Sequence, residues 1–194
     1  YLISLAILLG SCATTSRTSQ TQKQTPDVSK SETTINATPK TYLASATRTI
    51  DIIHTKLDVS FNWEKQYLYG KAYITLKPYF YPIKDVVLNA QGFEIKTISL
   101  SEKNPKALLY DYDKLKLKIN LDKEYTKNDT IQIFIDYIAK PNEKKSDSGV
   151  AIASDKGLYF INPIGEDKNK PTQLWTQGEP ESNSSWFPTV DKPN

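Results

Sequence analysis

The feature that most constrains the fold is a strict alternation of polar and apolar residues between positions 114 and 121. The apolar set is Leu115, Leu117, Ile119 and Leu121, and the polar set is Lys114, Lys116, Lys118 and Asn120. A period of two places one set on each face of a β-strand, whereas a helix would scatter both sets around its axis. The segment therefore predicts a strand of an antiparallel sheet with one buried face and one solvated face.

The same period recurs along most of the chain from residue 47 onward. Residues 57–61 and 72–76 alternate on either side of a turn predicted at 65–70, which indicates an antiparallel hairpin that Pro78 ends. Other strands are predicted at 86–88, 93–100, 131–137 and, as a hairpin, at 149–153 and 157–161, with a turn at 110–113. No window has a convincing helical period. We expect an all-β, mostly antiparallel domain of two packed or strongly curved sheets.

The first twelve residues indicate an export signal. They form a short apolar run that ends in Leu9-Gly10-Ser11-Cys12, a sequence that resembles the bacterial lipobox. Cys12 is the only cysteine, so an intramolecular disulfide is impossible and a single lipidated thiol is expected. The alternative is an ordinary secretory leader in which Cys12 has no role. Both interpretations predict export, and the first predicts a lipid anchor in the bacterial cell envelope, in the periplasm or at the outer membrane.

Residues 13–46 are rich in Ser, Thr, Gln and Lys and contain almost no large apolar side chain. Such a segment cannot bury enough surface to offset its ordering entropy, so we expect a flexible tether. The tether would connect a truncated signal peptide at 1–12 to a β domain at 47–194. The chain lacks an initial Met and stops just after a Pro-containing loop, which we interpret as a fragment at both ends.

Composition excludes several functions. A net charge of +3 with dispersed lysines does not favour a nucleic-acid partner. His54 is the only histidine and is expected to be structural or exposed, so an H-E-x-x-H zinc site is absent. Asp111 and Asp113 are interpreted as part of a turn, because the other oxygen ligands of a calcium loop are missing. No nucleotide-binding or acyl-transfer motif occurs. We therefore expect neither catalytic residues nor metal ligands in these 194 residues.

Residues 176–193 have a different composition from the predicted strands. They contain carboxylates, amides, the adjacent aromatics Trp186 and Phe187, and three prolines, without strand alternation. Proline fixes φ and removes a donor, which predicts a stiff irregular loop. Such loops on a rigid scaffold often carry binding groups. Residue types alone favour a solvated acid at Glu179.

Taken together, several segments resemble the N-terminal domain of the aminopeptidase N family of zinc metallopeptidases. The strand segments are 54–61, 68–76, 86–90 and 156–160. The more specific part is Thr-Gln-Gly-Glu at 176–179, followed by Phe-Pro-Thr-Val-Asp-Lys-Pro at 187–193. Two positions depart from the family pattern: Asn183-Ser184 replaces Ala-Arg, and Thr189 replaces Cys.

The resemblance implies a saddle-like β domain that lies against a catalytic domain further along the same polypeptide. That domain would carry G-x-M-E-N, H-E-x-x-H and the zinc, and peptides would be the substrates. Glu179 would bind the α-ammonium group of the substrate, and Gln177 would line the same pocket. Pro180, Trp186, Phe187 and Pro188 would hold the acid in place, and Glu181 would be a surface residue.

Two other functions are compatible with the sequence. The first is a non-catalytic β-sandwich module for binding or scaffolding, for example in an inactive homologue. The second is a carbohydrate-binding domain in which Tyr79, Phe80 and Tyr81 form a stacking platform. G-x-M-E-N and H-E-x-x-H beyond Asn194 would favour the aminopeptidase over both.

Overall fold

The computed structural model describes residues 47–103, 105–143 and 156–192. The predictions for the signal peptide, Cys12, the tether at 13–46 and the strand at 149–153 lie outside these residues. The prediction of an all-β, antiparallel fold is confirmed. Every strand pairing is antiparallel, and the only helices in the described ranges are the single 3-10 turns η1 (Pro141–Glu143) and η2 (Asn183–Ser185).

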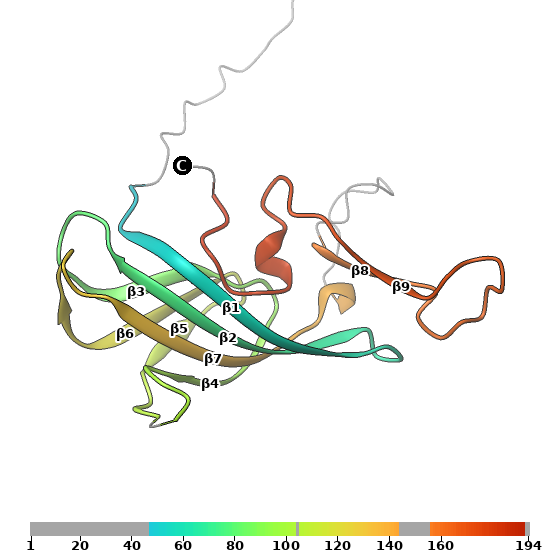
Figure 1. The fold of residues 1–194 in the computed structure, drawn as a ribbon, viewed down its shortest axis with the longest axis horizontal. Coiled ribbons are helices and arrows are strands. Elements are labelled where there is room, and N and C mark those ends of the chain that lie inside the picture. The colour runs from blue at the N-terminus through green and yellow to red at the C-terminus, as the bar shows by residue number, and fades with distance from the viewer. Residues whose placement is uncertain (1–46, 104, 144–155, 193–194) are drawn as a thin grey trace, which may run out of the picture. The chain divides into compact units, whose positions relative to one another are not determined.

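The strands form two larger sheets and a separate hairpin (Figure 1). The first sheet has the order β1 (Ile50–Asn62), β2 (Tyr67–Pro78), β7 (Ile131–Ala139) and β4 (Glu94–Ser99). The second has the order β3 (Ile83–Asn89), β6 (Lys116–Tyr125) and β5 (Tyr110–Tyr112). The hairpin pairs β8 (Leu158–Ile161) with β9 (Gln173–Thr176) and extends away from the two sheets.

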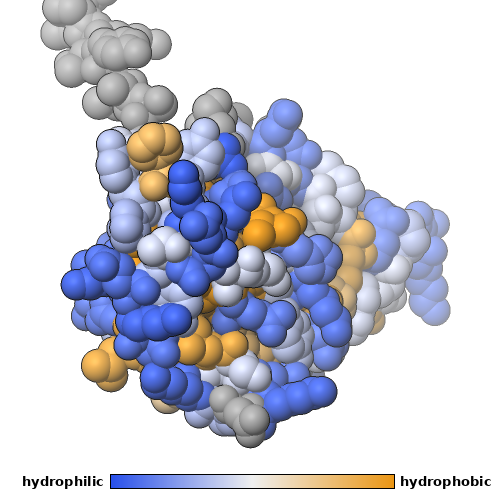
Figure 2. All heavy atoms as spheres, turned by 60° about the vertical axis from the view of Figure 1, so that its left-hand side comes forward, coloured by the Kyte–Doolittle hydropathy of each residue, from blue (hydrophilic) through white to orange (hydrophobic). Residues whose placement is uncertain are grey.

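The hydrophobic core lies between the two larger sheets. Alternate residues of β2 from Leu68 to Leu76 are buried, as the period of two predicts, and so are Leu117 and Ile119 of β6. Leu121 is only partly buried, and Leu115, expected on the same face, is 58% exposed. The lysines of β6 are exposed. The buried hydrophobic side chains of β2, β3, β6 and β7 are Leu68, Ala72, Ile74, Leu76, Val86, Leu88, Leu117, Ile119, Tyr125, Ile131, Ile133, Phe134, Ile135, Tyr137 and Ala139. Figure 2 shows hydrophilic residues over most of one outer face, with small apolar patches between them.

The first hairpin is confirmed, but its turn is shorter than predicted. The turn comprises 63–66, and residues 67–70 already belong to β2. Asn62 Oδ1 accepts a hydrogen bond from the Lys65 amide at 2.8 Å, and Gln66 adopts a left-handed φ of 57°. This local closure returns the chain within four residues, so β2 begins earlier than its apolar pattern indicates.

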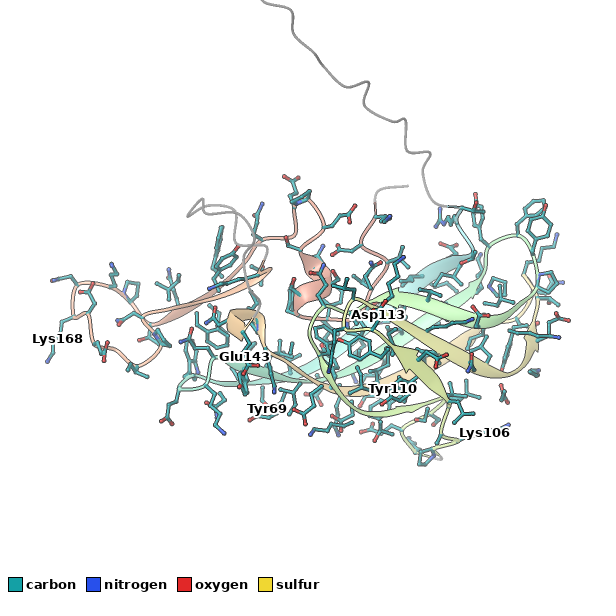
Figure 3. The ribbon with its side chains drawn as sticks, turned by 180° about the vertical axis from the view of Figure 1, so that it is seen from behind. Tyr69, Lys106, Tyr110, Asp113, Glu143 and Lys168 are labelled. Atoms are coloured by element: carbon teal, nitrogen blue, oxygen red, sulfur yellow. The ribbon has the colours of Figure 1, made fainter. Side chains whose placement is uncertain are left out.

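The turn predicted at 110–113 is wrong for its first three residues, which form β5 and pair with β6. Only Asp113 makes the turn (Figure 3): its Oδ1 accepts hydrogen bonds from the amides of Lys116 at 2.6 Å and Leu115 at 2.8 Å. These hydrogen bonds, that from Lys116 first, lower the pKa of Asp113. The tyrosines on either side of Asp111 thus favour the strand. The aspartate whose side chain caps the turn is Asp113, the first residue after β5.

The tyrosine of β5 at position 112 connects the two sheets. Its hydroxyl donates to the carbonyl of Ala90 at 2.8 Å and accepts a hydrogen bond from the amide of Phe93 at 2.6 Å. Both partners lie in the connection between β3 and β4, which belong to different sheets. Burial raises the pKa of Tyr112 from 10.0 to about 12, because the phenolate is less well solvated there than in the unfolded chain.

The raised pKa predicts that the chain loses stability at high pH. Below pH 10 the phenol of Tyr112 is neutral in both states, and between pH 10 and about 12 only the unfolded chain ionises there. In urea denaturation at a series of pH values, Tyr112→Phe should unfold more easily at pH 7, by roughly 1 kcal/mol. It should lose less stability than the parent above pH 10. Equal losses in both proteins would contradict the assignment.

Candidate functional site

The loop that carries Glu179, residues 177–192, starts directly after β9. We call it the Glu179 loop. Its first amide, that of Gln177, donates to the carbonyl of Gly157 at 2.9 Å, next to the start of β8. Gly157 has a left-handed φ of 68°, and a Cβ added there would lie 2.0 Å from the carbonyl oxygen of Ser182. The close approach of β8 to the loop therefore requires glycine at 157.

Inside the loop, the buried carboxylate of Asp191 accepts a hydrogen bond from the amide of Ser184. The distance from Asp191 Oδ2 to that nitrogen is 2.7 Å, and Asp191 is 9% exposed. The amide of Ser182 donates to the carbonyl of Gly178 at 2.9 Å, and Ser182, Ser184 and Ser185 are all buried. A charged acceptor that joins the middle of the loop to its end strengthens its closure, since hydrogen bonds to ions are stronger than neutral ones.

The second sheet holds the loop from one side. Asn89, the last residue of β3, exchanges two backbone hydrogen bonds with Thr189, at 2.7 and 3.0 Å. Gln91 follows in the chain: its amide donates to the carbonyl of Ser184 at 2.7 Å, and its side-chain Nε2 donates to Ser184 Oγ at 2.8 Å. The loop is thus an extension of the sheet edge and has a defined position.

The first sheet and the core hold the loop from the other side. Trp186 and Phe187 pack edge to face, with ring centroids 4.6 Å apart, and are partly buried against the core. Tyr137 of β7, whose pKa is raised by burial, donates its hydroxyl to the carbonyl of Trp186 at 3.0 Å. A Cβ at Gly70 of β2 would lie 2.5 Å from Tyr137 Cζ, so glycine is needed to make room for this ring.

Of the four residues predicted to hold the acid in place, Trp186 and Phe187 are partly buried against the core, Pro188 is buried and Pro180 is exposed. Trp186 Nε1, in the loop itself, is buried and makes no hydrogen bond with any residue that the structure describes.

The two predicted binding residues lie at the start of this loop. Glu179 is exposed, Gln177 is half-buried, and Glu181 is exposed as predicted. Within the described ranges, no hydrogen bond or ion pair engages the Glu179 carboxylate. Its backbone is held between the Gln177 and Ser182 hydrogen bonds. The arrangement is a free carboxylate on a fixed loop, which suits recognition of a cation.

A cleft lies elsewhere in the part of the chain that the structure describes, between β1, β3 and the end of the Glu179 loop. It has a volume of about 390 Å³ and is lined by Thr47, Arg48, Thr49, Ile50, Ile52, Val87, Asn89, Lys116, Thr189, Val190 and Lys192. Its three cations would suit an anionic group, but Arg48 is already paired with Asp51. Neither Glu179 nor Gln177 lines this cleft.

The described residues do not provide a metal site. They contain no group of three His, Cys, Asp or Glu side chains that could hold an ion, and His54 is exposed on β1. In the same ranges, no helix combines the length and apolar character that crossing a bilayer requires.

Comparison with known proteins identifies the family. Residues 51–194 match the family model described as the Peptidase M1 N-terminal domain, so the chain belongs to that family. This confirms the resemblance to the aminopeptidase N family. A comparison with curated protein sequences found no match.

Solved structures with the same fold include M1 zinc metallopeptidases. A mutant of the enzyme from Deinococcus radiodurans, bound to a Tyr-Ser-Ala substrate, is 18% identical with a TM-score of 0.58, over 75% of this chain and 30% of that one. A two-domain M1 zinc metallopeptidase mutant bound to L-arginine is 17% identical with a TM-score of 0.58, over 76% and 30%. Native yeast LTA4 hydrolase is 19% identical with a TM-score of 0.55, over 75% and 21%. The chain spans less than a third of each of these structures.

The sequence patterns missed the residues that fix the loop: Asn89, Gln91, Ser184 and Asp191. Asp191 belongs to the Phe-Pro-x-x-Asp-x-Pro segment, but nothing in that segment shows which amide the carboxylate reaches. Its neighbours Val190 and Lys192 are exposed, so no local pattern marks Asp191 as a buried acid.

We predict that Asp191→Ala loosens the Glu179 loop while the sheets remain folded. The amide of Ser184 would lose a charged acceptor, at a cost of about 2 kcal/mol. Hydrogen exchange followed by mass spectrometry should show faster exchange in residues 177–192 and little change in β2 and β7. Glu181→Ala, at an exposed position of the same loop, is the control. Unchanged exchange in Asp191→Ala would rule out this role.

Proposed function

We propose that this chain is the N-terminal domain of a zinc-dependent aminopeptidase that removes N-terminal residues from peptides. In this proposal the domain docks on a catalytic domain of the same polypeptide and contributes Glu179 to the substrate site. The observation that supports it most is the family match over residues 51–194, which includes the exposed carboxylate on its fixed loop. The peptide bound to the similar Deinococcus radiodurans enzyme supports the substrate class.

A carboxylate in this position has a physical function in an exopeptidase. Such an enzyme must recognise the free α-ammonium group, which only the first residue of a peptide carries. Glu179 would form short, directional, charge-assisted hydrogen bonds with it. Enclosure by a second domain would exclude water and strengthen the attraction. An internal segment of a peptide would leave the buried acid unpaired, and this cost gives the enzyme its selectivity for chain ends.

The remaining chemistry would come from the catalytic domain. The described residues hold no set of ligands that fits zinc, so in this proposal the metal and its ligands belong to that domain. Gln177, half-buried and two residues before Glu179, would line the same pocket. The chain itself would position the substrate and have no hydrolytic activity alone.

We predict that Glu179→Gln in the full-length polypeptide lowers kcat/KM for peptides with a free N-terminus by about 100-fold. Loss of one partner of an enclosed charge pair typically costs about 2–5 kcal/mol. Zinc content, measured by elemental analysis, should be unchanged. The matched control is Glu181→Gln, two residues further along the same loop, which should retain the parent activity.

Two results would contradict this proposal in different ways. A kcat/KM within a factor of about two of the parent for Glu179→Gln would remove the amine-binding role while leaving the peptidase in place. Absence of aminopeptidase activity in the zinc-loaded parent would instead favour the non-catalytic β-sandwich scaffold.

We further propose that the protein is exported and anchored by a lipid on Cys12. The support is the sequence alone: Leu9-Gly10-Ser11-Cys12 follows an apolar run and contains the only cysteine. A diacylglycerol and an N-acyl group together bury enough methylene groups for stable membrane attachment.

For the anchor, we expect the parent expressed in bacteria to incorporate labelled palmitate and to sediment with membranes. Cys12→Ser should incorporate none, because it lacks the thiol. A parent that stays unlabelled would instead support a secretory leader without lipid.

A further inference from the structure

The connection between β2 and β3 exposes three consecutive aromatic residues, Tyr79, Phe80 and Tyr81, which we call the aromatic tip. Their exposed fractions are 49%, 68% and 72%. The rings of Phe80 and Tyr81 pack edge to face with centroids 5.1 Å apart, so they present one joint surface. Contiguous aromatic exposure of this kind marks an interaction site, because single exposed apolar residues are common but clusters are rare.

The tip is held in place at its base. The amide of Tyr79 donates to the carbonyl of Thr49 at 2.9 Å, and the guanidinium of Arg48 lies 4.6 Å from the centroid of the Tyr79 ring. β2 ends at Pro78 and β3 begins at Ile83, with the exposed Pro82 between the tip and β3. The outer two rings therefore project from a short connection whose backbone is anchored to the start of β1.

This anchoring places the tip where the N-terminal segment reaches the domain. Thr47 is the first described residue and follows Cys12 by 35 residues (47 − 12). A flexible tether of that length, as the sequence predicts, would have a root-mean-square span on the order of 30–35 Å. A lipid on Cys12 would thus hold this end of the domain close to the bilayer. The inference rests on the proposed anchor for this geometry.

Bases and acids both lie around the tip, with a small excess of bases. Lys77 and Lys84 flank it in sequence, and Arg48 lies against the Tyr79 ring. Ile83 pairs with Tyr125, which brings Lys123 and Lys127 to the same end of the sheets. Five acids lie at this end: Asp51, Asp85, Asp122, Glu124 and Asp129. Asp51 is paired with both Arg48 and Lys77, Asp85 with Lys118, and Asp122 with Lys106. Protein segments that lie at an anionic membrane surface typically combine aromatic rings with basic side chains.

We propose that the aromatic tip inserts into the headgroup region of an anionic bilayer and sets the orientation of the anchored domain. Phe80 and Tyr81 would enter the interface, and the lysines would lie at the level of the lipid phosphates. The contact is weak by itself. The anchor makes it effective, because tethering raises the local concentration of the tip at the membrane.

The test uses the full-length polypeptide with Cys12→Ser, so that no lipid anchor contributes. Vesicles of phosphatidylglycerol and phosphatidylethanolamine are the probe, with phosphatidylcholine vesicles as the neutral comparison. In co-sedimentation, the combined Phe80→Ser and Tyr81→Ser substitution should lower the partition coefficient for the anionic vesicles about tenfold. Leu115→Ser is the matched control, since Leu115 is 58% exposed at the opposite end of β6. It should bind as the parent does.

A second readout locates the contact. Phe80→Trp should show a blue-shifted emission with the anionic vesicles and quenching by brominated acyl chains. Equal losses in the double variant and Leu115→Ser, or no binding by the parent, would overturn the proposal. Inhibition of vesicle binding by soluble oligosaccharides that bind the tip would overturn it in favour of a carbohydrate platform. Hydrolysis of short soluble peptides should be unchanged in the double variant, which separates this test from that of Glu179.

Discussion

The hydrogen bond from Tyr137 to the carbonyl of Trp186 connects the core to the Glu179 loop. The Tyr137 ring is fully buried and stacks on Phe93 with centroids 4.8 Å apart, so its hydroxyl has a fixed position. That ring fits because position 70 of the neighbouring strand lacks a side chain. The position of the Glu179 loop therefore depends on a close approach of two strands far from the acid itself.

The loop combines a rigid backbone with a solvated functional group. Its amides donate to Asp191 and Asn89, and Gln91 donates to the carbonyl and hydroxyl of Ser184, while the carboxylate of Glu179 has no partner within the described ranges. An exposed acid adds little desolvation free energy to the folded chain until a ligand or a second domain encloses it. Fixing the backbone in advance reduces the entropy that binding would otherwise lose.

Sequence patterns predicted those parts of the fold in which one face of a strand is buried. β2 and β6 follow strict alternation and were found, whereas β5 was mistaken for a turn because aspartate is common in turns and only pairing with β6 shows it to be a strand. β8 was expected to pair with 149–153, which lies outside the described residues, and the partner found for it is β9.

Glu179 was identified only through family resemblance. Its surroundings depend on contacts such as Ser184 to Asp191, which no local pattern encodes.

The bonds that close the Glu179 loop join segments far apart in sequence. Gln91 and Ser184, for example, are 93 positions apart. Such contacts form late in folding, since a long stretch of chain must be ordered before they contribute. During synthesis, the edge of β3 would stay unpaired until its partner, the Glu179 loop, has left the ribosome. The Glu179 loop therefore reaches its final geometry only in molecules whose sheets have already assembled, and a ligand that recognised this geometry would select those molecules.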